Sequence, residues 1–483
     1  MNTFNWYQKV FLLVCLTVIF VLTIGNVNAS PMPRVDDDFA AVDAYVTEQM
    51  NRLGIPGMAL GIVRGDQVVH VQGFGVADST GRSVTPQTPF YIGSVTKSFT
   101  SLAVMQLVED GKVDLDAPVE KYLPWFQVAN QDTSAKITVR NLLNHTSGIS
   151  EKEGSRVWVS QQGLEETFRG YGRIPLAHPV GATWEYSNAN YNIAGLIVEK
   201  VSGQPYADYV IQNILEPLDM RHSYTSRTLA LADGLSRGHH YMFGHAFEGD
   251  GPVPPANLPA GFMISSAEDM THYLIAQLND GQYRDAVILS PQGIAELHHP
   301  SVSTKLGFFY AMGWAVSSED GVPVVWHTGD TAYFHSKTIL VPDQKLGITL
   351  LANASGFEQM YQVDDIANGI LGILNGDAPA PVSLPFASRF MYWTILLMPF
   401  LQLAGIFYIW RNRGRMKGWR VWAVVILYIA IGIGFLQIPI PFPIPSMLVF
   451  FPDVAYGLIA IAVLGIGWSL AYAVLNLTVW KSK

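Results

Sequence analysis

The amino-acid composition changes abruptly at a proline-rich segment, GDAPAPVSLP, which occupies residues 376–385. Prolines at this density break helices and strands alike, so residues 376–390 are interpreted as a linker. Three runs without a charged residue follow, each about as long as a helix that crosses a bilayer. These runs are residues 391–410, 421–438 and 454–477. We therefore expect a globular domain followed by a membrane domain with three transmembrane helices over residues 391–483, and a hydrophobic content of 49% fits this division.

Positively charged residues are unevenly distributed over the connections between these runs. Residues 411–420 carry five lysines and arginines, residues 439–453 carry none, and the C-terminus ends in Lys481 and Lys483. Because connections rich in Lys and Arg remain in the cytoplasm, the first connection and the tail are expected there. Residues 31–385 would then lie on the extracytoplasmic side of the cell membrane, periplasmic or extracellular, with the lipid bilayer as a partner of a multi-pass protein.

Residues 1–29 have the pattern of a secretory signal peptide. A polar start with Lys9 precedes an apolar run at residues 10–24, and Val27 and Ala29 occupy the −3 and −1 positions of a cleavage site. The alternative is an uncleaved anchor, which the shortness of the apolar run disfavours. A signal peptide would deliver the following domain across the membrane, in agreement with the orientation that the charged connections predict.

The charge and the cysteine content exclude some classes of function. The chain has 30 Lys and Arg against 39 Asp and Glu, a formal net charge of −9, so it offers no overall basic field to a nucleic acid. The single cysteine, Cys15, permits no internal disulfide. Neither an H-E-x-x-H motif nor the Cys/His spacing of zinc sites occurs, so no metal and no cofactor are expected.

The domain between the signal peptide and the linker, residues 30–375, has strand patterns at both ends. Turn residues and apolar runs predict strands at 57–65 and 67–78 and four more between residues 309 and 355. Helical candidates are residues 95–110, 138–144, 189–201 and 205–215, followed by a loop-rich stretch at 226–263 and a closing helix at 358–375. The expected fold is α+β, an antiparallel sheet built from both chain ends and flanked by helices, with an inserted helical region.

The segment GSVTKSFT at residues 93–100 places a serine and a lysine three positions apart at the start of a predicted helix. Ser94 and Lys97 would face the same way, with Cβ atoms about 5–6 Å apart. A serine hydroxyl needs a neighbour that accepts its proton, and a desolvated, neutral lysine can do so. The helix N-terminus would also favour the oxyanion that acylation creates. The alternative is that Ser94 only caps the helix and Lys97 is solvated, because S-x-x-K is a common tetrad.

Two further motifs follow in the order and approximate spacing of a known catalytic set. Y-S-N at residues 186–188 precedes a predicted amphipathic helix, and H-T-G at residues 327–329 ends a predicted strand. With the S-x-x-K tetrad they resemble the three signatures of the serine β-lactamase and penicillin-binding-protein superfamily. The tyrosine and histidine versions resemble the class C β-lactamase-like branch, serine peptidase family S12, over about residues 38–375.

The resemblance implies a role for each matching residue. Ser94 would be the nucleophile, and Lys97 its proton acceptor or the cation that stabilises the acceptor. Tyr186 would be the second base and would protonate the leaving group, and which base takes the proton first stays open. The backbone N–H groups of Ser94 and Asp330 would form the oxyanion hole. Residues implied to bind the substrate are Asn188, His327, Thr328 and Gly329.

Two residues depart from the penicillin-binding pattern. His327 stands where that pattern has lysine, which removes a permanent cation, and Asp330 adds a carboxylate next to the H-T-G triplet. If the side chain of Asp330 faces the cleft, it repels a substrate carboxylate and favours an amine or a neutral group. Efficient β-lactam hydrolysis is therefore not expected to be the native activity.

The order of signal peptide, S12-like domain and three spans is similar to that of membrane-bound D-peptidases that remove an acyl-D-amino-acid cap from secreted natural products. The resemblance implies a membrane-anchored serine hydrolase that cleaves an amide or ester of a small-molecule or peptide-like substrate through an acyl-Ser94 intermediate. The alternative is a sensor of β-lactams or cell-wall peptides that is acylated without rapid turnover. Such a sensor would need a membrane partner protein, because the expected cytoplasmic segments are short.

Overall fold

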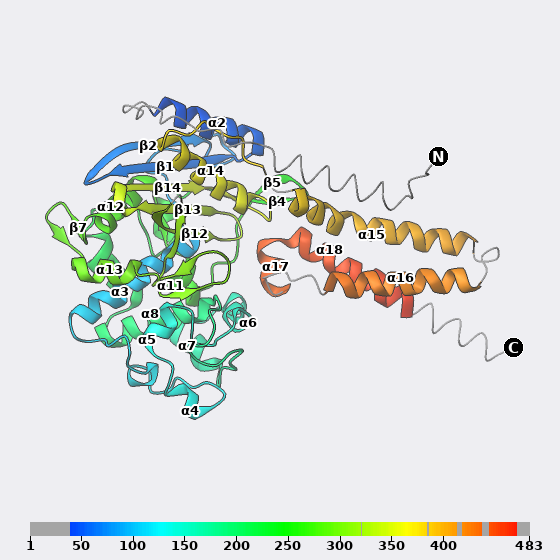
Figure 1. The fold of residues 1–483 in the computed structure, drawn as a ribbon, viewed down its shortest axis with the longest axis horizontal. Helices are drawn as coiled ribbons and strands as arrows, with labels where there is room; N and C mark the ends of the chain where they lie inside the picture. Colours follow the sequence, from blue (N-terminus) through cyan, green and yellow to red (C-terminus); the bar gives the residue numbers. More distant parts are fainter. Residues whose placement is uncertain (1–38, 320, 384–385, 413–417, 437–443, 471–483) are drawn as a thin grey trace, which may run out of the picture.

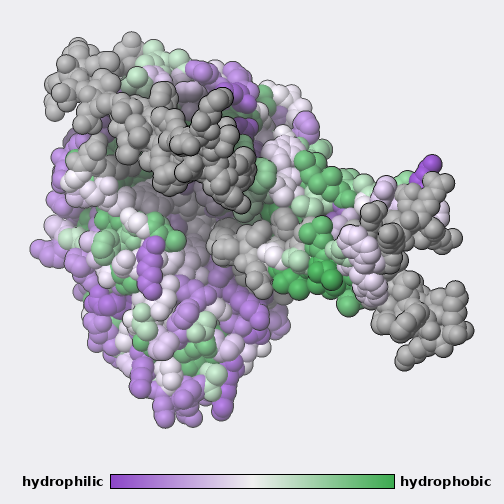
Figure 2. Space-filling view, turned by 45° about the vertical axis from the view of Figure 1, so that its right-hand side comes forward, coloured by the Kyte–Doolittle hydropathy of each residue, from purple (hydrophilic) through white to green (hydrophobic). Residues whose placement is uncertain are grey.

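The computed structural model describes residues 39–470 except 320, 384–385, 413–417 and 437–443, so the predicted signal peptide lies outside the described residues. A rounded domain contains the strands and most helices, and three long helices project from it to one side (Figure 1). These are α15 Phe386–Asn412, α16 Gly418–Leu436 and α18 Pro452–Ala462. Figure 2 shows hydrophobic residues gathered on the projecting part, whereas hydrophilic residues dominate the visible face of the domain.

An eight-stranded antiparallel sheet lies at the centre of the domain, in the order β2-β1-β14-β13-β12-β11-β10-β9. The strands are β1 Gly57–Arg64, β2 Gln67–Gly75, β9 Val302–Ser303, β10 Phe309–Tyr310, β11 Ala315–Glu319, β12 Val322–Asp330, β13 His335–Val341 and β14 Leu346–Ala352. β1 pairs with β14, so the two ends of the domain meet in one sheet as predicted. Side chains alternate along β1, and Met58 and Leu60 enter one hydrophobic core while Ala59 enters the other.

Helices cover both faces of the sheet (Figure 1). On one face, α14 (Gln359–Leu374) packs on β13, β14 and α2 (Ala40–Leu53), which confirms the predicted closing helix. On the other face, α12 (Ala267–Leu278) packs on β1 and β14. The inserted region centres on α3 (Thr96–Glu109) and α8 (Asn188–Ser202), which pack against each other. Its shorter helices include α5 Val139–Leu143, α6 Glu151–Gly154, α7 Leu164–Gly170, α9 Tyr206–Val210 and α11 Leu258–Gly261. The α+β fold is confirmed.

The stretch at 226–263, predicted to be loop-rich, contains regular structure. After α10 (Arg227–Ala232), β4 (Gly238–Met242) and β5 (His245–Gly249) form a hairpin. β4 also pairs in parallel with β15 (Ala354–Ser355). The first four residues of β4 are all buried, so both of its faces are covered and its residues show no alternation of apolar and polar side chains.

Within the described residues, two helical segments are long and apolar enough to cross a membrane, Arg389–Tyr408 and Pro452–Leu470. They fall in the first and third predicted spans. α16 covers most of the second predicted span, at 421–438, but does not pass the same test, so three spans remain a prediction.

The connection before the third predicted span contains regular structure that the sequence analysis did not predict. It contains a short helix, α17 (Ile444–Phe450), which leads directly into α18. Pro445 lies in the first turn of α17, where a proline removes no helical hydrogen bond, so the helix forms despite it.

Candidate active site

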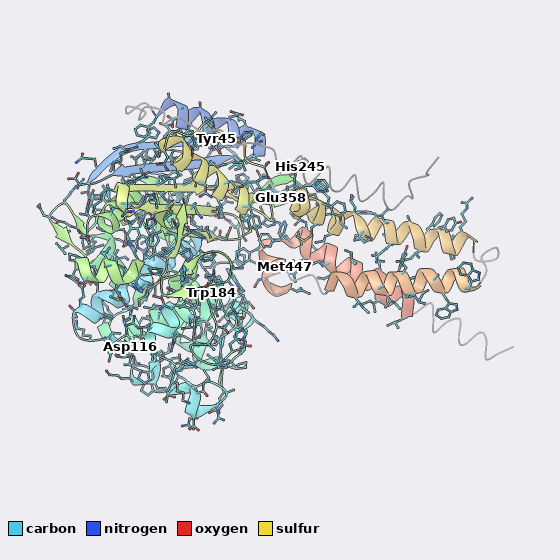
Figure 3. All side chains as sticks on the ribbon, viewed as in Figure 1. Tyr45, Asp116, Trp184, His245, Glu358 and Met447 are labelled. Carbon is cyan, nitrogen blue, oxygen red and sulfur yellow. The ribbon has the colours of Figure 1, made fainter. Side chains whose placement is uncertain are left out.

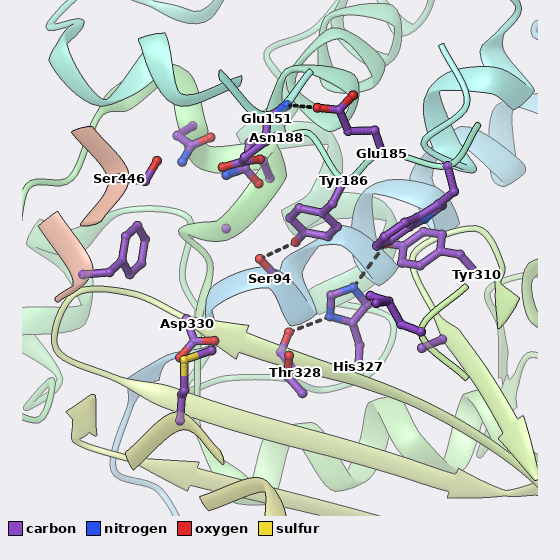
Figure 4. Close-up of a pocket in the computed structure, with 18 of the residues that line it drawn as sticks. Ser94, Glu151, Glu185, Tyr186, Asn188, Tyr310, His327, Thr328, Asp330 and Ser446 are labelled. Carbon is purple, nitrogen blue, oxygen red and sulfur yellow. Dashed lines mark hydrogen bonds between the residues drawn. The ribbon is translucent and has the colours of Figure 1, made fainter. Parts of the chain in front are cut away.

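Ser94 lies where a turn, a helix and the end of a strand meet (Figure 4). The 3-10 turn Gly93–Val95 leads into α3, and Lys97 is in the first turn of that helix. Gly93 has a φ of +51°, and a Cβ on it would clash with the backbone nitrogen of Asp330. A Cβ on Gly329 would likewise clash with the carbonyl of Ile92. Both glycines therefore let the segment that carries Ser94 approach the end of β12.

Lys97 is fully buried and its ammonium nitrogen has three neighbours. Nζ lies 3.0 Å from the Ser94 hydroxyl, 2.7 Å from Oδ1 of Asn188 and 2.6 Å from the carbonyl of Ala260 in α11. Burial lowers the pKa of Lys97 to about 7. A neutral amine can donate its two N–H groups to Oδ1 of Asn188 and the carbonyl of Ala260, because these oxygens only accept, and then its lone pair faces the hydroxyl of Ser94.

Tyr186 approaches Ser94 from the other side. Its hydroxyl donates to Oγ of Ser94 at 2.8 Å, and Lys97 Nζ lies 4.6 Å from the centre of its ring. Burial raises the pKa of Tyr186 well above its ordinary value, so the phenol keeps its proton. The ring of His145 lies 4.5 Å from that of Tyr186, and its Nδ1 accepts from the backbone N–H of Ser187 at 3.2 Å. His145 therefore holds the segment that carries Tyr186.

The H-T-G triplet lies at the end of β12, as predicted. His327 is buried, and Nδ1 donates to the carbonyl of Thr328 at 2.6 Å while Nε2 lies 3.2 Å from the hydroxyl of Tyr310. Burial, and to a lesser extent the positive charge of Lys97 when that amine is protonated, lowers the pKa of His327 to about 3. The triplet therefore presents a neutral imidazole, and no permanent cation replaces the lysine of the penicillin-binding pattern.

Asp330 is held by a buried chain of charged groups. Its Oδ1 lies 2.6 Å from Nδ1 of His335, whose Nε2 lies 2.9 Å from Oδ1 of Asp364. Lys337 Nζ lies 3.6 Å from the other oxygen of Asp364. Burial opposes a charge on His335, but the carboxylates of Asp330 and Asp364 raise its pKa to about 10. His335 therefore remains an imidazolium at neutral pH and fixes the side chain of Asp330 beside the pocket.

A single pocket of about 500 Å³ joins these residues, within the size range of small-molecule sites. Predicted site residues in its lining are Ser94, Tyr186, Asn188, His327, Thr328 and Asp330. Lys97 and Gly329 are absent from the lining, and the buried Lys97 contacts the pocket-lining Ser94 through its Nζ. All predicted site residues are thus brought together, and their catalytic roles remain proposals.

Several lining residues were not singled out in the sequence, and others were misplaced. Residues missed are Glu151, Trp184, Tyr310, Ser446, Phe450 and Phe451. Burial raises the pKa of Glu151 to about 8, against the opposing effect of Lys97, and its Oε2 is buried without a hydrogen-bond partner among the described residues. Trp158 also lines the pocket, whereas the aromatic side chains of Phe243 and Phe247 are exposed and do not belong to its lining. No periodicity marks such residues, because the pocket draws them from separate loops and helices.

Residues 42–371 match the sequence profile of the family described as beta-lactamase. The chain belongs to the beta-lactamase family. Members of this family are serine hydrolases, and the chain is accordingly an enzyme of the β-lactamase and penicillin-binding-protein type. This confirms the superfamily to which the three motifs pointed.

Named relatives of this beta-lactamase-family enzyme come from three different organisms. Protein flp of Staphylococcus aureus (strain MW2) is 29% identical over 387 residues, which cover 78% of this chain and 75% of that protein. Unguisins hydrolase ungD' of Aspergillus campestris (strain IBT 28561) is 29% identical over 342 residues, 66% of this chain and 62% of the hydrolase. The structure of the octameric penicillin-binding protein homologue from Pyrococcus abyssi is similar with a TM-score of 0.65 and 28% identity, over 74% of this chain and 82% of that one.

Proposed function

We propose that this enzyme cleaves an amide or ester through an acyl-Ser94 intermediate. The observation that carries the proposal is the hydrogen-bonded row of Tyr186, Ser94 and Lys97, with 2.8 Å from the phenol to Oγ and 3.0 Å from Oγ to Nζ. A nucleophile with a proton acceptor on one side and a donor on the other is what a two-step acyl transfer requires. The fungal relative named a hydrolase supports hydrolysis as the outcome.

Lys97 is proposed as the first base. Its lowered pKa, about 7, supplies the neutral amine at working pH, whereas the raised pKa of Tyr186 makes the phenolate scarce. The Oγ–H proton of Ser94 would move to Nζ as Oγ attacks the substrate carbonyl. The resulting ammonium would be stabilised by Asn188 and by the carbonyl of Ala260.

Tyr186 is proposed to donate the proton that the leaving group needs. Its hydroxyl already points at Oγ of Ser94. The phenolate that remains would accept a proton from the water that attacks the acyl group, and Lys97 would return its proton to Oγ as the acyl group leaves. The developing oxyanion would accept from the backbone N–H groups of Ser94 and Asp330, which the two glycines bring close together. A water would then release the acyl group from Ser94 by the reverse route.

The electrostatics of the pocket favour some substrates over others. The neutral His327 and the fixed carboxylate of Asp330 leave little to attract a substrate carboxylate, so an amine or a neutral group is preferred at that position. We propose a D-amino-acid peptidase or esterase of the S12 type. Its C-terminal helices anchor it in a membrane, and its catalytic domain lies on the extracytoplasmic side. A tether of this kind raises the effective concentration of a substrate that is delivered at the membrane surface.

The proposal is tested by steady-state hydrolysis of matched D- and L-aminoacyl p-nitroanilides and methyl esters by the purified full chain. The expected result is turnover that prefers the D series and disappears in Ser94→Ala. Turnover that survives in Ser94→Ala would overturn the nucleophile. A stable adduct without turnover in the wild type would favour the sensor instead.

A further inference from the structure

The C-terminal helices contribute part of the wall of the active-site pocket. Ser446 and Phe450 of α17, and Phe451 between α17 and α18, line the same cavity as Ser94. Figure 4 shows the segment with Ser446 beside the pocket, and Met447 lies at the junction between the domain and the projecting helices in Figure 3. The domain alone therefore does not complete its own substrate site.

Aromatic contacts seat α17 against the domain. The ring of Phe450 meets that of Trp158 edge to face at 5.1 Å, and Trp158 meets Phe262 at 5.6 Å in the same manner. Phe357 meets Phe451 at 5.5 Å and stacks on Tyr392 of α15 at 5.9 Å. Edge-to-face pairs at these distances are favourable contacts, so this wall belongs to the folded packing of the chain.

Polar contacts hold the same junction. Asp453, in the first turn of α18, is buried, and one of its carboxylate oxygens accepts from the backbone N–H of Phe243 at 3.0 Å and from the hydroxyl of Tyr392 at 2.6 Å. Phe243 lies in the turn of the β4–β5 hairpin, so the hairpin, α15 and α18 meet at one carboxylate. The position of α17 relative to Ser94 is thereby fixed from two sides.

The part of the pocket that Ser446, Phe450 and Phe451 line, called the α17 wall, lies on one particular side of the nucleophile. In Figure 4, Ser446 and the helical segment that carries it lie on the opposite side of Ser94 from His327 and Tyr310. The leaving group must reach the hydroxyl of Tyr186, which supplies its proton in the proposed function. The acyl group that stays on Ser94 extends from the carbonyl carbon in a different direction from the leaving group. On the side of the pocket away from His327, the α17 wall is the apolar surface that can contact it.

The wall is also continuous with a candidate membrane segment. α17 leads directly into the segment Pro452–Leu470, which is long and apolar enough to cross a bilayer, and α17 itself carries no charged residue. If this segment spans a bilayer, as proposed above, a molecule that partitions into the bilayer surface meets Phe450 and Phe451 before it meets Ser94. An amphiphile suits this arrangement, because its polar end can reach the catalytic groups while its apolar end remains on the aromatic wall.

Resting on the proposed acyl-Ser94 chemistry, we propose that the α17 wall is an acyl-chain subsite, and that the substrate is an amphiphilic amide or ester whose retained acyl moiety carries an extended apolar chain. The chain lies against Trp158, Phe262 and Phe450. Chemically, Oγ of Ser94 bonds to the acyl carbon, the bond to the leaving oxygen or nitrogen breaks, the proton of Ser94 passes to Lys97, and Tyr186 donates its proton to the leaving group. Water then hydrolyses the seryl ester to the free acid, giving a proton to Tyr186, while Lys97 returns its proton to Ser94.

The test uses p-nitrophenyl esters of straight-chain acids, from acetyl to octanoyl, with the full chain in detergent at substrate concentrations below micelle formation. Because each buried methylene contributes about 0.8 kcal/mol, kcat/KM of the wild type is expected to rise about fourfold per methylene until the subsite is filled. In Phe450→Ala the ratio of octanoyl to acetyl kcat/KM is expected to fall about tenfold. Leu448→Ala, which removes an exposed side chain of the same helix outside the pocket, should keep the wild-type ratio.

A second variant keeps the test decisive if Phe450→Ala fails to fold. Ser446→Trp fills the subsite, so the octanoyl ester is expected to lose at least tenfold in kcat/KM relative to the acetyl ester. A wild-type ratio in both variants, or a wild type without chain-length dependence, would overturn the acyl-chain subsite while acetyl turnover preserved the proposed function. Absence of any Ser94-dependent turnover in the wild type would overturn both.

Discussion

The two ends of the active-site pocket are held in different ways. At the Ser94 end, hydrogen bonds of 2.6–3.0 Å join Ser94, Lys97 and Tyr186 to buried backbone and side-chain groups of one domain. At the α17 end, aromatic rings from two regions of the chain meet at 5.1–5.5 Å. The polar end determines whether a bond is cleaved, and the apolar end determines which molecule is presented, so changes at the two ends should have separable effects.

The largest effect is expected at Lys97. Lys97→Met removes the proton acceptor of Ser94 and leaves Asn188 and the carbonyl of Ala260 facing an apolar side chain. We expect kcat/KM to fall about 10³-fold, within the range of a lost general base. The loss should be equal for short and long acyl chains, because the acyl-chain subsite is untouched. A loss confined to long chains would show that the two ends are not separable.

The next effect is expected at Gly93. In Gly93→Ala the new Cβ clashes with the end of β12 at a φ of +51°, so the backbone N–H groups of Ser94 and Asp330 move apart. We expect kcat/KM to fall about 10²-fold for every chain length. Gly65→Ala is a matched control, because Gly65 also has a positive φ, +61°, but no atom lies within 4 Å of its added Cβ. Equal losses in the two variants would assign the effect to backbone strain rather than to the oxyanion hole.

The pH dependence of the polar end follows from the lowered pKa of Lys97. Below a pKa of about 7 the ammonium form predominates and accepts no proton, so kcat/KM is expected to fall by on the order of tenfold per pH unit. Above it, kcat/KM should reach a plateau, because Tyr186 keeps its proton. The profile is measured with acetyl and octanoyl esters, and the same midpoint is expected for both. A midpoint near the ordinary lysine pKa would contradict a neutral Lys97.

The smallest effect is expected at Asp330. Asp330→Asn removes a charge beside the pocket and leaves an oxygen that His335 can still donate to. We expect the preference for a cationic over an anionic acyl group, measured as a ratio of kcat/KM values, to fall about fivefold, since the charge is partly compensated by His335. The octanoyl to acetyl ratio should stay unchanged. An unchanged charge preference would remove Asp330 from substrate selection.

The sequence predicted the polar end well, because its residues come in motifs. Ser94 and Lys97 are three apart on one helix, and the segment of Tyr186 and Asn188 opens another helix, so local spacing already brought each pair together. That these pairs meet the end of β12 followed from the family resemblance and not from spacing. The pairing of β1 with β14 was predicted from strand patterns at both ends of the domain and is confirmed.

The sequence did not predict the apolar end. Residues 439–453 were treated only as a connection between spans, and an apolar run at that place gave no reason to put Phe450 against Trp158. The ion pairs of His335 with Asp330 and Asp364 were also missed, because they join β12, β13 and α14 across one face of the sheet. Contacts of this kind depend on how distant segments pack, which no local pattern records.

The central claim is that Ser94 forms a covalent acyl intermediate, and intact-mass measurement tests it most directly. The full chain is mixed with p-nitrophenyl octanoate, and the reaction is quenched in acid at times shorter than one turnover. The Ser94→Ala variant is treated in the same way. The account predicts an added mass of one acyl group on the wild type, located at Ser94 by peptide mapping, which decays as octanoic acid appears. No adduct on the wild type, or an equal adduct on Ser94→Ala, would contradict it.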